Sequence, residues 1–156
     1  MRKSLVLALL VLMFAVGSAA AAQKPTREVF GLRLGMSEEA VHERLRKIAR
    51  QQKEEKEEEE GGEQEVWILK HDAKSDYLLT RFNEEHRLIL ITVVAQLQQV
   101  RYADLASLHD ASKATDGVNY SYKWKVAATK QQPAFLIIAR GSEAEFLTSY
   151  SLYLAR

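Results

Sequence analysis

The first 22 residues have the order of an export signal that is removed. They therefore define which part of the chain has to fold, and in which compartment. Arg2 and Lys3 form a basic start, residues 5–16 are an unbroken apolar run, and small residues follow as far as Ala22. This order is typical of a secretory signal peptide, and the apolar run is too short to span a bilayer. We therefore expect residues 1–22 to be removed, a mature chain that begins at Gln23 and does not span the membrane, and a periplasmic or secreted location.

The mature chain must form a stable core without disulfide bonds. Removal of 22 of the 156 residues leaves 134, the size of one domain. The chain has no cysteine, so it has no disulfide, no thiolate metal site and no thiol nucleophile. A chain of this length buries about two-thirds of its unfolded surface, which is sufficient for a packed core.

The charge balance of the mature chain excludes two classes of partner. Without Arg2 and Lys3 it has 20 basic and 21 acidic residues, a net charge of −1. A nucleic-acid-binding domain would be expected to have a basic surface, and a membrane-surface protein a polybasic segment. We therefore expect neither nucleic acid nor a lipid surface as the partner.

The first half of the mature chain predicts one helix and three strands. After a polar lead-in at residues 23–28, residues 29–34 are predicted to be extended. Ser37 is predicted to cap a helix with its hydroxyl, and the helix is expected to run to about Gln52. Three strands are expected at 66–70, 77–82 and 88–95, and the last of these is apolar enough to be central in a sheet.

The second half repeats this order of elements. Residues 102–115 are predicted to be helical, and strands are expected at 119–128, 134–140 and 145–153. The predicted fold is α+β, with two helix–strand–strand–strand halves and an antiparallel sheet that carries both helices on one face. Residues 29–156 would then form a single domain with a charged insertion at 53–65.

The charged insertion has two interpretations. Residues 53–65 are rich in glutamate and contain the pair Gly61 and Gly62. Such a run is typical of a solvated helix end and loop, which we favour. The alternative is a weak site for a divalent cation or a basic partner, although the run lacks the ligand spacing of a calcium-binding loop.

No motif for catalysis or cofactor binding is present. The sequence lacks nucleophile elbows, phosphate-binding loops and HExxH motifs. Its four histidines include no pair at the i, i+4 spacing; they are His42, His71, His86 and His109. We therefore expect a protein that is not an enzyme and has no cofactor, metal ligand or catalytic residue.

Five aromatic residues on two predicted strands are the candidate partner-binding residues: Tyr120, Tyr122, Trp124, Tyr150 and Tyr153. The favoured interpretation places this group under the helices as part of the core. The alternative places it on the open face of the sheet, where Tyr and Trp would provide a contact surface for a partner.

Residues 30–41, with the sequence FGLRLGMSEEAV, resemble the opening of a group of small exported bacterial domains. The group includes the SmpA/OmlA-type outer-membrane assembly lipoproteins and the β-lactamase inhibitory protein. In these, an extended G-[IL]-x-[LI]-G-M-[ST] segment precedes a helix, and a hairpin similar to residues 82–88 follows. The resemblance implies a periplasmic or secreted binding domain without known catalysis, although this chain has no cysteine to carry a lipid.

These observations predict an exported, non-catalytic binding protein of the bacterial cell envelope that contacts another envelope protein. One alternative is a periplasmic carrier of a small ligand or lipid, which would require a large closed apolar cavity. A second alternative is an enzyme of unrecognised type, which would require a pocket of convergent polar groups.

Overall fold

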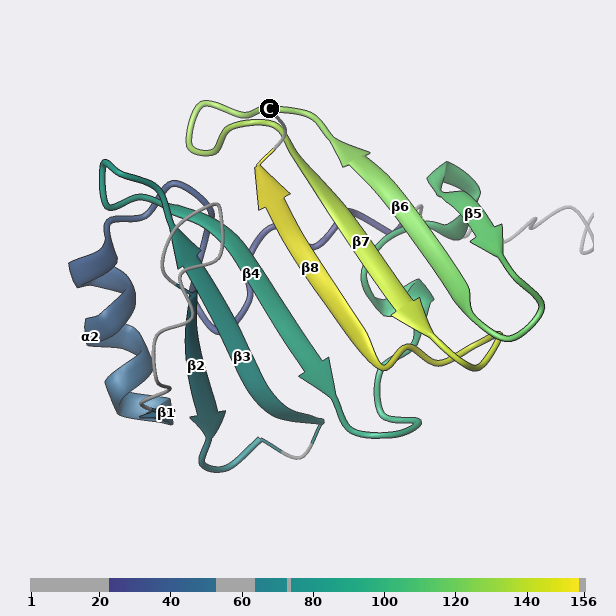
Figure 1. Ribbon diagram of the computed structural model, residues 1–156. Helices are drawn as coiled ribbons and strands as arrows, with labels where there is room; N and C mark the ends of the chain where they lie inside the picture. The colour runs from purple at the N-terminus through teal and green to yellow at the C-terminus, as the bar shows by residue number, and fades with distance from the viewer. Residues whose placement is uncertain (1–22, 53–63, 73, 155–156) are drawn as a thin grey trace, which may run out of the picture.

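The computed structural model describes residues 23–52, 64–72 and 74–154 as a mainly β protein (Figure 1). The predicted signal peptide and residues 53–63 of the charged insertion lie outside the described residues. Eight antiparallel strands form one sheet in the order β1-β2-β3-β4-β8-β7-β6-β5. The strands are β1 (Ala49–Gln52), β2 (Gln64–Leu69), β3 (Ser75–Phe82), β4 (Leu88–Ala95), β5 (Ser112–Thr115), β6 (Tyr120–Val126), β7 (Phe135–Gly141) and β8 (Ser149–Leu154).

The order of the strands divides the sheet into two meanders. Strands β1 to β4 are sequential neighbours in one half, and β5 to β8 are sequential neighbours in the other. The halves join where β4 pairs with β8, so that Leu90 lies opposite Tyr153 and Val93 opposite Tyr150. The predicted central position of residues 88–95 is therefore confirmed.

The predicted fold class, α+β with two helices on one face, is wrong. The described residues contain one α-helix, α2 (Glu38–Ile48), and the segment predicted as a second helix contains two 3-10 turns and an edge strand. The turns are η1 (Tyr102–Asp104) and η2 (Leu108–Asp110), and the strand is β5. In an α-helix the Ser107 carbonyl would accept from the amide of residue 111, but here it accepts from the Asp110 amide at 3.2 Å and from Trp124 Nε1 at 2.8 Å.

Helix α2 ends at Ile48, four residues earlier than predicted. The next residues are extended, and β1 pairs with β2 so that Ala49 lies buried opposite Leu69. Strand pairing and burial therefore override the helical tendency of residues 49–52.

The start of α2 is partly as predicted. Ser37 occupies the N-cap position, but its side chain makes no capping hydrogen bond. Its backbone forms an isolated bridge with Arg87, which ties the start of the helix to the turn between β3 and β4. The predicted position of the cap is therefore confirmed, and the predicted hydrogen bond to the Ser37 hydroxyl is wrong.

Residues 29–34 form a tight turn rather than an extended segment. Val29 and Leu32 exchange two backbone hydrogen bonds of 3.0 and 2.8 Å. The two residues between them have φ values of +52° at Phe30 and +78° at Gly31. Two successive positive φ angles match the twist of a two-residue hairpin, and glycine adopts such angles at little steric cost.

One face of the sheet, here called the core face, carries the hydrophobic core. Helix α2 places Val41 and Leu45 on it, and the turn η1 and the residue that follows it place Tyr102 and Leu105 on it. Figure 1 shows the described segment before α2 and the segment between β4 and β5 passing behind the sheet, with α2 beside its β1–β2 edge. The side chains that fill this layer and have no exposed surface include Leu32, Leu78, Leu88, Ile91, Val93, Ile137 and Leu152.

Candidate functional site

The structure divides the five predicted partner-binding aromatics between two faces. Tyr122 and Trp124 are 7% and 2% exposed and belong to the core. Tyr120 and Tyr150 are half-buried and pack against the same core. Alternate residues of a strand point to opposite faces, so Tyr153 lies on the opposite side of β8 from Leu152, which is fully buried in the core.

Packing inside the sheet explains why the stripe on β6 is core. The Tyr122 ring lies 4.5 Å from the Tyr102 ring and 6.0 Å from the Trp124 ring, measured between centroids. Lys113 on the neighbouring strand places its ammonium 5.5 Å from the centre of the Tyr122 ring. Burial raises the pKa of Tyr150 to about 12, with a smaller contribution from Asp72, so its hydroxyl stays neutral at physiological pH.

The other side of the sheet, here called the outer face, is a candidate binding surface. The strand registers align its residues in three rows that run across the sheet, and most members of these rows are half-buried. The apolar and aromatic members are Val66, Ile68, Tyr77, Leu79, Leu90, Val94, Leu136, Ile138 and Tyr153. At the centre, Thr92 and Ser151 share a 2.8 Å hydrogen bond.

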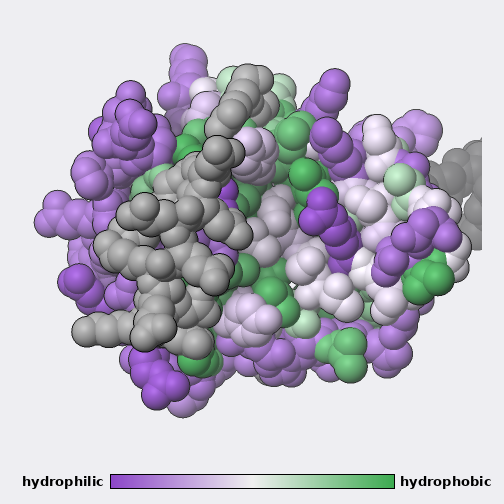
Figure 2. Space-filling view, viewed as in Figure 1, coloured by the Kyte–Doolittle hydropathy of each residue, from purple (hydrophilic) through white to green (hydrophobic). Residues whose placement is uncertain are grey.

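Cations lie toward the ends of these rows. The cationic residues of the outer face are Arg50, Arg81, Lys123, Lys125 and Arg140. Among the eight strands the only acidic residues are Glu65, on the core face, and Asp76, at the irregularity between Ser75 and Tyr77. Figure 2 shows, beside the grey atoms, hydrophobic and weakly polar residues in the middle of this side, a hydrophilic stripe to their right and further hydrophilic residues along the margins. The outer face therefore combines a centre of apolar, aromatic and small hydroxyl side chains with cations toward its rim.

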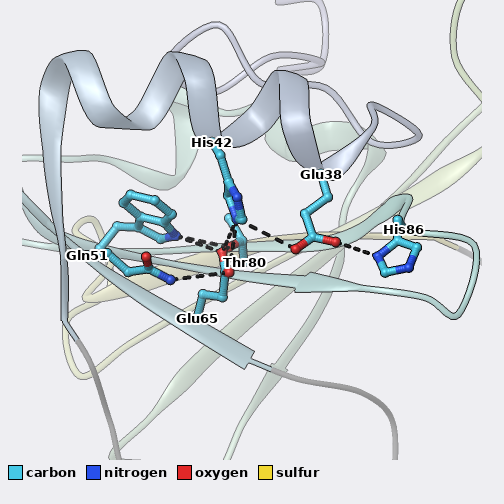
Figure 3. A network of polar contacts seen from close by, with 7 residues as sticks. Glu38, His42, Gln51, Glu65, Thr80 and His86 are labelled. Carbon is cyan, nitrogen blue, oxygen red and sulfur yellow. Dashed lines mark hydrogen bonds and ion pairs between the residues drawn. The ribbon is translucent and has the colours of Figure 1, made fainter.

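A second candidate site lies between α2 and the start of β2, on the core face. His42 Nε2 lies 2.9 Å from both carboxylate oxygens of Glu65. Figure 3 shows the two side chains pointing toward each other from the helix and the sheet. The Glu65 carboxylate also accepts hydrogen bonds from Trp67 Nε1 at 3.2 Å, Thr80 Oγ1 at 3.3 Å and Gln51 Nε2 at 3.3 Å. Its side chain is 12% exposed, so a charge that usually lies in solvent is held inside the protein by polar contacts.

Glu38 extends this network toward the surface. Its Oε1 lies 4.0 Å from His42 Nε2, and its Oε2 lies 2.6 Å from His86 Nδ1. Residues four apart on a helix share one face, so Glu38 and His42 point together toward the sheet. A hollow of about 430 Å³ opens beside this group; its lining residues are Ser37, Glu38, Glu39, His42, Arg46 and His86.

Sequence analysis missed this group for two reasons. Glu65 was placed at the end of the solvated charged insertion, but it is the second residue of β2 and points to the core face. The search for metal ligands considered pairs of histidines, whereas the i, i+4 pair present here is Glu38 and His42. The alternation of Glu65, Trp67 and Leu69 along one strand was the available signal.

The chain matches no protein-family model, no curated protein and no solved structure. Among the residues that the structure describes, no helix is long and apolar enough to cross a membrane. The function is therefore argued from the geometry of the two candidate sites.

Proposed function

We propose that this chain is an exported, non-catalytic binding protein of the bacterial cell envelope, and that it contacts another envelope protein through the outer face. The observation that carries the proposal is the composition of that face, where apolar and aromatic side chains with a few small hydroxyl side chains fill the middle of the rows and cations lie toward their ends. Apolar and aromatic residues at the centre of a surface and polar residues at its rim are typical of protein interfaces.

The charges of the outer face define the chemistry of the partner. On the outer side of the strands there are five cations, and the one strand acid that does not point to the core face is Asp76, although the mature chain as a whole is close to neutral. Complementary potentials accelerate association and select the partner. The expected partner is an envelope protein with an apolar patch bordered by aspartate and glutamate.

Two further observations support binding to a protein rather than carriage of a small ligand. The core face is filled by side chains with little exposed surface, where a carrier would need a large closed apolar cavity. The resemblance of residues 30–41 to exported binding domains favours the same function. The outer face also provides Tyr153, the one predicted contact aromatic outside the core, and Tyr77, which is 39% exposed.

The test compares two lysines that lie on adjacent strands and opposite faces. Lys123 is on the outer face, whereas Lys113 on β5 contacts aromatic rings of the core face, and both are exposed. Mature protein carrying Lys123→Glu, Lys113→Glu or neither is immobilised and exposed to envelope extract at low salt. We expect a protein retained by the native chain and by the Lys113 variant to be lost from the Lys123 variant and to be released from the native chain by added salt. Equal retention by both variants would contradict the proposal.

A further inference from the structure

We propose that Glu38, His42 and Glu65 form a binding site for a divalent transition-metal ion of the Zn²⁺ type. The site joins α2 to β2 and is separate from the outer face. One oxygen from each carboxylate and one nitrogen of the imidazole lie within 4.8 Å of one another. Imidazole nitrogen and carboxylate oxygen are ordinary ligands of Zn²⁺ in proteins.

The distances between these donor atoms suit a single ion. Zinc bonds of about 2.0–2.1 Å in a tetrahedron place neighbouring ligand atoms about 3.3 Å apart. The separation between His42 Nε2 and Glu65 Oε1 is 2.9 Å, and that between His42 Nε2 and Glu38 Oε1 is 4.0 Å. The first distance is slightly shorter than the ideal value and the second is slightly longer. Small side-chain movements would therefore allow all three residues to bind one ion.

Contacts outside the three ligands hold the two carboxylates in place. The Trp67 indole and the Thr80 hydroxyl project from the sheet and both donate to Glu65 Oε2, while Glu65 Oε1 also lies 2.9 Å from His42 Nε2. His86 Nδ1 lies 2.6 Å from Glu38 Oε2, the oxygen that does not face His42. Hydrogen bonds of this kind orient metal ligands, and their loss typically lowers metal affinity 10–100-fold.

Burial and charge provide a second argument for a cation. Glu65 and Glu38 bring two carboxylates to one imidazole, with side chains that are only 12% and 32% exposed. A divalent cation would neutralise both carboxylates in a place where water is partly excluded. The adjoining hollow of about 430 Å³ leaves room for a water molecule as the fourth ligand.

The donor set also selects among metals. Calcium takes six to eight oxygen ligands, and magnesium requires a nearly ideal octahedron of oxygens. Three protein ligands that include an imidazole nitrogen suit zinc and its first-row neighbours better. We therefore expect Zn²⁺ to bind and Ca²⁺ to bind at least tenfold more weakly.

The experiment is isothermal titration of tag-free mature protein with zinc chloride, after treatment with a chelator. The variants are His42→Gln and Glu65→Gln, which remove a ligand while keeping the size and polarity of the side chain. The matched control is His109→Gln, because His109 is an exposed histidine in η2, away from the site. We expect one equivalent of Zn²⁺ on the native chain, at least a tenfold loss of affinity in both site variants, and less than a twofold change in the control.

Either of two results would overturn the proposal: no zinc binding by the native chain, or native-like binding by the folded His42 variant. The second result would mean that the network only fixes α2 to the sheet and that zinc binds elsewhere. If His42→Gln or Glu65→Gln does not fold, Glu38→Gln replaces it, because that side chain is more exposed. The melting temperature of the native chain should rise with added Zn²⁺ and not with Ca²⁺, and an equal response to both ions would contradict the metal class.

Discussion

Replacing Tyr122 with alanine should destabilise the domain far more than the same change at Tyr77. Tyr122 is 7% exposed and its ring lies 4.5 Å from the Tyr102 ring, whereas Tyr77 is 39% exposed on the outer face. Truncation of a buried aromatic costs about 3–5 kcal/mol because it removes apolar burial and leaves a cavity. Tyr77 keeps 39% of its surface in solvent on an uncovered face, so its truncation leaves no enclosed cavity and should cost about 1 kcal/mol. The two variants should therefore differ by about 3 kcal/mol in free energy of unfolding.

Urea unfolding followed by tryptophan fluorescence measures this difference. A slope of about 2 kcal/mol per molar urea converts 3 kcal/mol into a difference of about 1.5 M between the two midpoints. The substitution is the same in both variants, so its effect on the unfolded chain largely cancels. Equal midpoints, or a lower midpoint for Tyr77→Ala, would refute the assignment of core face and outer face.

Three further changes test local features of the fold. Gly141→Ala should cost about 1–3 kcal/mol in urea unfolding, because the added methyl group would lie 2.6 Å from the Phe146 carbonyl oxygen; no loss of stability would contradict this packing. Ser37→Ala should change the free energy of unfolding by less than about 0.5 kcal/mol, since its hydroxyl makes no capping bond; a loss near 1 kcal/mol would restore the capping role. Hydrogen bonds from Asn119 lower the pKa of Asp116 to about 2 from a usual 3.8, so its stabilising contribution is complete above pH 4 and is lost as the pH falls toward 2. Asp116→Ala should flatten this part of the pH–stability profile, and an unchanged profile would show that other groups cause it.

Strands β2 to β4 and β6 to β8 were predictable because their patterns reflect burial, whereas β1 and β5 fall in segments that were predicted to be helical. Residues 88–95 match β4 in both bounds, and the alternation of Tyr122 and Trp124 with lysines marks β6 correctly. The pattern of apolar residues within each of these segments reflects which of its side chains are buried. This pattern can be recognised without knowing which strands lie beside the segment.

The prediction of a second helix was wrong because the residues that hold this segment in another conformation are distant in the sequence. Residues 102–115 have apolar residues at helical spacing, but Trp124 takes the Ser107 carbonyl and residues 112–115 pair with β6. The loss of one helix changed the fold class from α+β to mainly β. The local spacing of apolar residues contains no information about the contact with Trp124 or about the pairing with β6.

The candidate sites were predictable only in part. The interpretation of the aromatic stripe as core was right for Tyr122 and Trp124. The open face of the sheet lies on the opposite side of the same strands. The outer face could not be predicted because its rows depend on the order in which eight strands pair. The group of Glu38, His42 and Glu65 likewise depends on the packing of α2 against β2.

Photo-cross-linking in the native envelope tests the central claim, binding through the outer face, most directly. A photoreactive amino acid replaces Tyr153 or Tyr77 on the outer face, and Leu97 or Val118 at other exposed sites, which are 75% and 69% exposed. We predict that irradiation produces the same discrete adduct from both outer-face positions and none from the other two. Adducts that form only from Leu97 or Val118, or no adduct from either tyrosine position, would contradict the claim.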